Sequence, residues 1–198
     1  MSFYKNQADE QTAQRTDIAV YMDITGMSGA EPAGEGDRVY TKCGTAWTSF
    51  TENPGAQTKQ RKFINEKTER NNITRYAPQW AFECLLMYNR PDIKKIYDII
   101  KKRKTGKDTV VTLIVVDLFE TSGDGYSARM LNASVQVSSL DDDDDMIIKG
   151  TFYNQGDEVL GSFNTETGVF TADEANNAEA AAADNRGTSD TTTEESGS

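Results

Sequence analysis

The stretch TVVTLIVVDLF, residues 109–119, constrains the fold more strongly than any other part of the chain. It is almost continuously apolar and rich in β-branched residues, which favour extended backbone. A strand with one face in water alternates apolar and polar residues, and this stretch does not. It therefore predicts a central strand that is buried on both faces.

Further strands are expected on the amino-terminal side of this stretch. The short apolar patch at 18–22 could form a strand or an arm that docks on a neighbour. Residues 39–50 favour a strand, with a bulge or turn at Gly44. ENPGAQ, at 52–57, carries Asn-Pro-Gly and predicts a turn, so that 59–64 could be the return strand of a hairpin.

The remaining strands are expected to be joined mostly by tight turns. Residues 74–88 alternate apolar and polar side chains, as a half-buried strand does. Gly-containing turns then separate the later strands. The strands are expected at 74–88, 126–140, 146–153 and 158–163, and the turns at 123–125, 154–157 and 165–168.

RPDIKKIYDIIKKRKTGKD, at 90–108, predicts the one helix. Pro91 suits a first turn, the basic residues at 101–104 complement the helix dipole, and Gly106 suits a carboxyl-terminal cap. Its apolar residues recur at the spacing of one helix face. With the strand faces they define the expected core: Trp80, Phe82, Leu86, Ile93, Ile96, Tyr97, Ile100, Val111, Leu113 and Val115.

These elements predict a mainly β fold, an antiparallel β-sandwich or barrel of about seven to eight strands with one flanking α-helix. We expect three regions: an N-terminal arm and Gly-rich loop at 1–38, a β-domain at 39–170, and an acidic low-complexity tail at 171–198. The tail has no Leu, Ile, Val, Met or aromatic residue, so we expect it to be disordered. It carries −6 of the formal net charge of −11, which leaves −5 on the body.

The sequence shows no recognisable catalytic constellation. Acidic residues and Tyr are plentiful, which leaves an enzyme that uses only carboxylates or Tyr as a third alternative, but nothing pairs them. There is no histidine, the commonest general base and metal ligand. No Ser or Cys stands in a nucleophile-elbow context, and the Gly-rich segment 26–37 lacks the pattern of a phosphate-binding loop. We therefore expect no enzyme activity, no catalytic residue, no bound metal and no cofactor.

The cysteine count and the hydropathy indicate a chain made in a cytosol. Cys43 and Cys84 are too few for a disulfide framework, and we expect both to be reduced core residues. The polar start does not resemble a signal peptide, and no apolar run approaches the ~20 residues that span a bilayer. We expect no membrane partner.

Two charged runs leave other interpretations open. Adjacent carboxylates can bind Ca²⁺, and Asp141 to Asp145 are consecutive, although their spacing is not that of an EF-hand. A solvated loop is the simpler interpretation, and the alternative function is a soluble β-sandwich binding module with a Ca²⁺ site at this run. The basic cluster at 101–107 lacks a flanking aromatic platform for nucleic acid. We interpret it as a solvated helix end or as a partner for an acidic surface.

The order of motifs from about residue 39 to 171 resembles a known family. The more specific ones are INEKTE followed by Y-x-P-x-x-x-F-E at 76–83, and GDxxxGxFNxxTGxFT at 156–171. As an ordered set they resemble the major tail tube proteins of long-tailed (siphophage-type) bacteriophages, in the branch common in Gram-positive hosts. The acidic tail is an addition to the family pattern. The other matching segments are WTSF, ENPGAQTKQRKF, NNITR, RPD, RKTGKD, VVTLIVVDLF and GDGYSARMLNASVQVSSL.

The resemblance implies a structural subunit of the virion tail, made in the host bacterial cytoplasm. Six subunits would form a ring, and the rings would stack into a hollow tube through which DNA passes into the host. The implied partners are further copies of the chain and the tape-measure, tail terminator and baseplate or tail-tip proteins. An acidic body suits this role, because a negative wall repels phosphates and lets the genome pass without sticking.

The family also implies that a long hairpin or loop reaches the next ring. On this basis the charged segment 59–72 is expected to project and make polar contacts between rings, while 74–88 returns into the sheet. An ordinary long hairpin loop is the alternative. The expected ring-stacking residues are Lys59, Gln60, Arg61, Lys62, Asn65, Glu66, Lys67, Glu69 and Arg70.

Overall fold

The structure is a computed structural model that describes residues 12–28, 30, 38–65, 67–142 and 144–174. Helix α1 spans Pro91–Lys101, and the short 3-10 helices η2 and η3 span Arg15–Asp17 and Gly106–Thr109. No helix within the described ranges has the length and hydropathy to cross a membrane. The strands are β1 (Ile18–Asp23), β2 (Tyr40–Lys42), β3 (Trp47–Asn53), β4 (Gln57–Arg61), β5 (Arg70–Arg75), β6 (Gln79–Leu85), β7 (Val110–Ser122), β8 (Gly125–Asp142), β9 (Met146–Asn154), β10 (Val159–Asn164) and β11 (Val169–Ala172).

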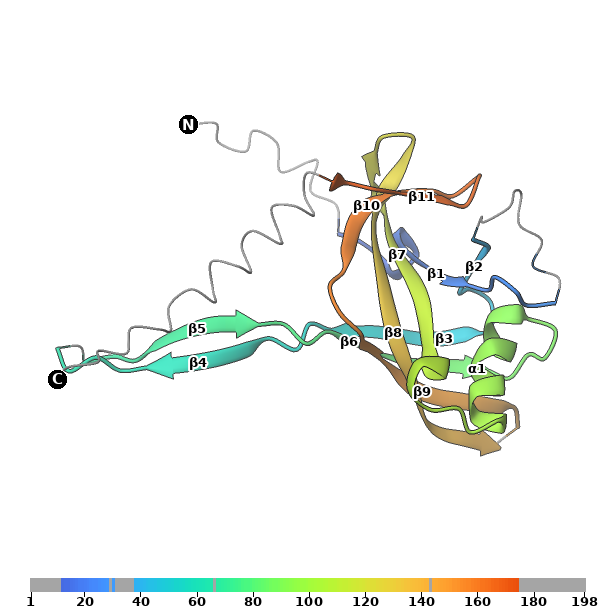
Figure 1. The fold of residues 1–198 in the computed structure, drawn as a ribbon, viewed down its shortest axis with the longest axis horizontal. Helices are drawn as coiled ribbons and strands as arrows, with labels where there is room; N and C mark the ends of the chain where they lie inside the picture. Colours follow the sequence, from blue (N-terminus) through green and yellow to red (C-terminus); the bar gives the residue numbers. More distant parts are fainter. Residues whose placement is uncertain (1–11, 29, 31–37, 66, 143, 175–198) are drawn as a thin grey trace, which may run out of the picture.

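Nine of the strands formed by the described residues make one curled antiparallel sheet (Figure 1). Seven follow one another in the order β2-β1-β7-β8-β9-β6-β3. The long strand β8 pairs with β10 through its first part and with β9 through its second, and β11 adds to β10. The expected fold class, mainly β with one flanking α-helix, is confirmed.

Strand β7 has apolar side chains packed on both of its faces, as its sequence predicts. Val111, Leu113 and Val115 belong to the larger core, which α1 covers. Ile114 and Val116 point the other way, into a smaller core with Phe163 of β10. Because side chains alternate along a strand, one continuous apolar run supplies both cores.

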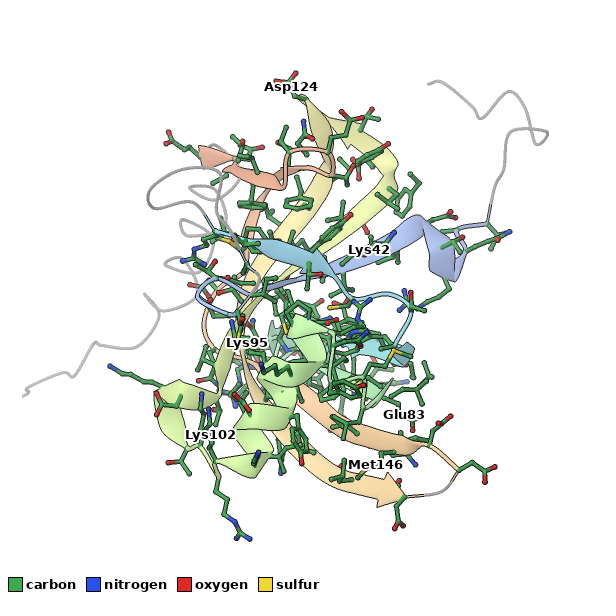
Figure 2. All side chains as sticks on the ribbon, turned by 90° about the vertical axis from the view of Figure 1, so that its right-hand side faces the viewer. Lys42, Glu83, Lys95, Lys102, Asp124 and Met146 are labelled. Carbon is green, nitrogen blue, oxygen red and sulfur yellow. The ribbon has the colours of Figure 1, made fainter. Side chains whose placement is uncertain are left out.

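The expected core residues lie at two levels of burial. The buried ones come from β6, α1 and β7, and the others pack at the edge of the larger core beside α1. Figure 2 shows α1 in front of the sheet, with Met146 of β9 to the right of its lower half. Buried are Trp80, Phe82, Ile93, Ile96, Val111, Leu113 and Val115, and partly buried are Leu86, Tyr97 and Ile100.

The predicted turn at 52–57 and the return strand at 59–64 are wrong. Asn53 pairs with Gln79 and Gln57 pairs with Arg75, so the chain keeps its direction from β3 into β4. Pro54 interrupts the ladder because it has no N–H, but the chain does not reverse there. The hairpin thus continues past the break, from the β3–β6 pair into the β4–β5 pair, and β4 is its outgoing strand.

The break itself requires a glycine. Gly55 has a φ of +60°, and a Cβ at this position would lie 2.2 Å from the carbonyl oxygen of Ala77 on the opposite strand. The Ala77 N–H donates to the Gly55 carbonyl over 3.2 Å. The Asn-Pro-Gly sequence therefore makes a joint within a long hairpin.

The folded body begins before residue 39. Strand β1 lies between β2 and β7 in the sheet, and Ala19, Val20 and Met22 are buried. Residues 18–23 of the expected arm are thus an internal strand. The expected Gly-rich loop lies mostly, and the tail beyond residue 174 entirely, outside the described residues.

Helix α1 ends earlier than Gly106, which was expected to cap it. Arg103 takes the left-handed conformation, with φ of 49°. The Arg103 N–H donates to the Ile100 carbonyl and the Lys104 N–H to the Ile99 carbonyl, both over 3.0 Å. This is the capping pattern usually completed by glycine, and Gly106 instead begins η3.

Candidate assembly surfaces

Strands β4 and β5 form an arm that extends away from the body (Figure 1). They pair with each other and make a separate two-stranded sheet. Every described residue from Ala56 to Ala77 is exposed. An isolated two-stranded hairpin is marginally stable in water, so a segment of this kind gains order when a partner covers it.

The arm carries the expected ring-stacking residues together with apolar side chains that the charge pattern had obscured. Ile64 is fully exposed at the tip and Phe63 is 47% exposed, with the Arg70 guanidinium 5.5 Å from its ring centroid. Ile73 and Tyr76 are exposed nearer the base. Lys59, Gln60 and Arg61 lie on β4, Lys62, Asn65, Lys67 and Glu69 lie in the tip, Arg70 begins β5, and Glu66 lies outside the described residues.

An ion-pair cluster lies in the body beside the base of the arm and joins β3 to β8. The Arg129 guanidinium of β8 donates to both carboxylate oxygens of Glu52, over 2.8 and 3.0 Å, and to Glu158 over 3.4 Å. The hydrogen bonds from Arg129 lower the pKa of Glu52, whereas burial raises the pKa of Glu158 despite the same partner. The cluster borders a cavity of about 620 Å³ that Pro54, Ile73 and Tyr76 also line.

A buried carboxylate fixes the amino terminus of α1. Asp92 is 0% exposed and accepts hydrogen bonds from Trp47 Nε1 over 2.8 Å and from the Arg90 Nε and Nη2 atoms over 3.1 and 2.9 Å. Arg90 also donates to the Lys42 carbonyl over 2.8 Å. A buried charge is tolerated only when it is paired and hydrogen-bonded, and these contacts tie α1 to β2 and β3.

Beside α1 lies a second cavity, of about 530 Å³. Its apolar lining comes from Leu86 and Tyr88 after β6, Tyr97 of α1 and Met146 of β9. Tyr88 is 88% exposed, so the cavity opens at a hydrophobic rim. We call it the helix-side pocket. Its charged lining is Asp144 and Asp145 before β9, and Lys94, Asp98 and Lys101 on α1.

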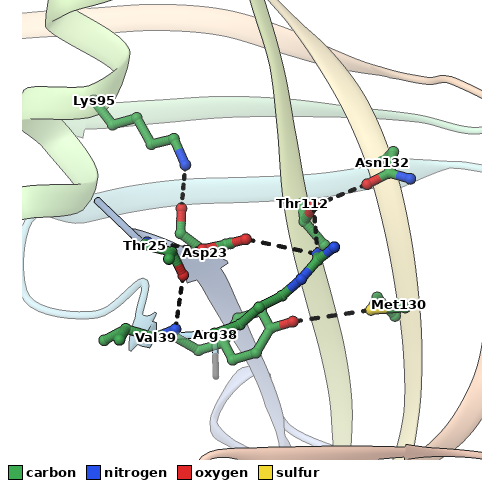
Figure 3. A network of polar contacts seen from close by, with 9 residues as sticks. Asp23, Thr25, Arg38, Val39, Lys95, Thr112, Met130 and Asn132 are labelled. Atoms are coloured by element: carbon green, nitrogen blue, oxygen red, sulfur yellow. Dashed lines mark hydrogen bonds and ion pairs between the residues drawn. The ribbon is translucent and has the colours of Figure 1, made fainter. Parts of the chain in front are cut away.

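A polar network holds β1 and the chain before β2 against the body (Figure 3). The Asp23 carbonyl accepts a hydrogen bond from Lys95 of α1 over 2.5 Å, and its carboxylate lies 3.6 Å from the Arg38 guanidinium. Partial burial lowers the pKa of Lys95. The Val39 N–H donates to the Thr25 hydroxyl over 2.8 Å. The two ends of the Gly-rich segment are thus fixed close together.

Three strands lie at edges of the sheet. Within the described residues, β2 pairs only with β1, β3 only with β6, and β11 only with β10. Their outer backbone groups can accept another strand. Strand β3 is the longest of the three, and it ends at the base of the arm.

The described residues of the acidic run are not gathered into a metal-binding group. Among the described residues, no group of three or more acidic or cysteine side chains is arranged to hold a metal ion. Asp141 is paired with Lys149 over 2.9 Å, which lowers the pKa of its carboxyl, and Asp143 lies outside the described residues. The basic residues of 101–107 are exposed.

Together these surfaces define a β protein with a projecting arm, a pocket beside its helix and open sheet edges. No family model and no curated protein matches the chain. Among solved structures it is similar to a chain from one described as "Cryo-EM structure of the anti-feeding prophage (AFP) baseplate, 6-fold symmetrised". The TM-score is 0.44 with 12% sequence identity, over 76% of this chain and 96% of the other.

Proposed function

We propose that the chain is a structural subunit of a phage tail tube that assembles into six-membered rings, which stack into a conduit for DNA. The observation that carries the proposal is the arm formed by β4 and β5, with its fully exposed Ile64. An arm without a core of its own and with an apolar tip is suited to contact another subunit. The ordered motifs of the sequence support the same role.

The sheet edges supply a route to ring closure. Strands β2 and β3 stand at the two ends of the seven-strand path, each with one strand partner in the described part of the chain. Pairing between the edges of adjacent subunits would continue the curled sheet from one copy to the next. Closure of the ring would then cover the edges at β2 and β3, which would otherwise be open to uncontrolled aggregation.

The charge of the chain fits the passage of DNA. The formal net charge is −11, so long-range repulsion keeps phosphate backbones from binding tightly. The role is architectural and uses neither catalysis nor a cofactor. In the virion tail the tube would meet tape-measure, tail terminator and baseplate or tail-tip proteins, after synthesis in the host cytoplasm.

Electron microscopy of the purified full-length protein tests the proposal. We expect rings or tubes at high protein concentration and six-fold symmetry in class averages of end-on views. Sedimentation velocity over the same concentrations should show a species of six subunits or larger. A protein that remains monomeric at every concentration would contradict a tube-forming role.

A further inference from the structure

We infer that the arm tip of one copy docks into the helix-side pocket of a second copy. The inference rests on the proposed function and adds to it the surface that receives the arm. It commits to one occupant for the pocket, the segment around Phe63 and Ile64 of another identical chain. Three observations carry it: both surfaces are apolar at their centres, the charges around them are complementary, and the two surfaces lie at opposite ends of the molecule.

The two surfaces are apolar at their centres. Phe63 and Ile64 stand exposed at the arm tip, and Tyr88 and Met146 stand exposed at the pocket rim with Leu86 and Tyr97 behind them. A pocket of about 530 Å³ has room for one or two such side chains. Insertion would remove from water the most exposed apolar residue of the described chain, Ile64.

The charges around these centres are complementary. Lys62 and Lys67 flank the apolar tip, and Asp144 and Asp145 line the β9 side of the pocket. The helix side of the pocket carries Lys94 and Lys101, and Asp98 there is paired with Lys102 over 3.0 Å. The tip also carries Glu69. Opposite signs on the two walls would fix which way the tip enters, and they give Asp144 and Asp145 a role as part of a docking site.

The arm and the pocket lie at opposite ends of β6. This strand begins at Gln79, beside the base of the arm, and ends at Leu85, next to the pocket residue Leu86. In Figure 1 the arm extends to the left of the body and α1 lies at its right. A strand advances about 3.3 Å per residue, so the chain from Gly55 to Ile64 reaches roughly 30 Å.

This placement makes the contact head-to-tail. The arm points away from its own pocket, so each copy offers one tip and one pocket to two different neighbours. Such an interface propagates along a stack and does not close in a pair.

Cysteine cross-linking of the full chain tests the contact directly. The double variant Ile64→Cys with Tyr88→Cys places one thiol on the tip and one on the rim, while the native Cys43 and Cys84 are buried. After assembly and mild oxidation with diamide, we expect a ladder of covalent trimers and larger species on a non-reducing gel. The matched control pairs Ile64→Cys with Asp124→Cys, an exposed position at the β7–β8 turn (Figure 2).

The outcomes separate the two proposals. If tubes form but the Ile64/Tyr88 pair gives no more multimers than the Ile64/Asp124 pair, the arm docks elsewhere and the inference is overturned, whereas the tube function stands. The single variant Ile64→Cys is a second control. If it forms covalent dimers in the same yield in which the double variant forms cross-linked species, the tips meet each other and the inference is again wrong. If unmodified protein forms neither rings nor tubes, the proposed function fails first, and the inference with it.

A complementation experiment uses the direction of the contact. Ile64→Asp disables the tip and leaves the pocket, and Asp144→Lys with Asp145→Lys disables the pocket and leaves the tip. Each protein alone should form rings that do not stack. Their mixture should form stacks of two rings, because one working tip faces one working pocket. Stacks of unlimited length from either variant alone would overturn the inference.

Discussion

The indole Nε1–H of Trp47 donates a hydrogen bond to Asp92 Oδ2 over 2.8 Å and thereby joins the edge strand β3 to the first turn of α1. Arg90 neutralises the same carboxylate over 2.9 Å. Removal of Asp92 would leave the Trp47 indole N–H without its acceptor and the partly buried Arg90 guanidinium without its counter-charge. The position of the helix, and hence of the helix-side pocket, depends on this contact.

We expect Asp92→Ala to lower the free energy of unfolding by about 3 kcal/mol, the cost of breaking a buried ion pair from one side. Urea denaturation followed by circular dichroism measures the change. Asp98→Ala is the matched control, because it removes an exposed pair with Lys102 on the same helix, and it should cost less than about 1 kcal/mol. Equal losses for the two variants would contradict the anchoring role of Asp92.

Glu52→Gln should destabilise the protein at neutral pH and not in acid. The hydrogen bonds from Arg129 lower the pKa of Glu52 below its ordinary value of 4.5. A carboxyl whose pKa is depressed by folding contributes stability above its unfolded pKa and loses it as the pH falls through the folded pKa. We expect a loss of about 1 kcal/mol at pH 7 that shrinks below pH 4.5, measured by urea denaturation across that range.

Glu158→Gln is the control for Glu52→Gln, because Glu158 contacts the same Arg129 but its pKa is shifted in the opposite direction. Burial raises the pKa of Glu158, so its ionised form is less favourable in the folded protein than in the unfolded chain at neutral pH. The amide variant should therefore be as stable as the parent protein, or more stable, at pH 7. A pH-independent loss for Glu52→Gln would show that shape, and not charge, makes the contact at the arm base.

Arg103→Gly should stabilise the protein. Arg103 holds a φ of 49° at the end of α1, a conformation that costs an L-residue about 1 kcal/mol and glycine almost nothing. We expect a rise of about 2–4 °C in the melting temperature by calorimetry. Lys102→Gly, at a right-handed position with φ of −90°, should lower it.

Replacement of residues 59–72 by a short Gly-Ser turn should prevent the growth of tubes and leave the body folded. The arm pairs only within itself in the described structure, and its residues belong to neither core. Circular dichroism and thermal unfolding should match the parent protein, while electron microscopy should show single rings. Tubes formed by the shortened chain would show that the arm has no part in stacking.

The two thiols should be inert in the folded protein. Burial raises the pKa of Cys84 to about 12 and raises that of Cys43 as well, so neither is a thiolate at pH 8. Mass spectrometry after iodoacetamide treatment at pH 8 should find no label in native protein and two labels in urea. Rapid labelling of native protein would indicate that the larger core opens.

The sequence predicts an element well where its local pattern has one physical meaning. The apolar run of β7 has to be covered on both faces. Ile93 and Ile96 are spaced so that both side chains lie on one helix face, which has to pack on a core. The Asn-Pro-Gly sequence at 53–55 has two meanings, a reversal or an interruption, and only pairing with Tyr76–Pro78 decides between them. Composition favours the reversal, and the partner strand imposes the interruption.

The candidate assembly surfaces were harder to predict than the fold. The family resemblance implied a projecting segment at 59–72, but Phe63 and Ile64 look like ordinary core residues until the pairing of β4 with β5 leaves them in solvent. The pocket joins residues after β6, on α1 and before β9, which no local pattern relates. Asp92 resembles a common acidic residue of a first helical turn, and its burial depends on Trp47, which lies far away in the sequence.

The joint at Gly55 and Ala77 has a mechanical consequence. One backbone hydrogen bond crosses it, over 3.2 Å, and the flanking prolines, Pro54 and Pro78, cannot donate others. Rotation at this joint would tilt the arm and leave both cores intact, because no arm residue belongs to either core. A column built from rings joined by such arms would bend without breaking the contacts between rings. Each arm would change its angle at Gly55 while its tip stays bound in the pocket of the next ring.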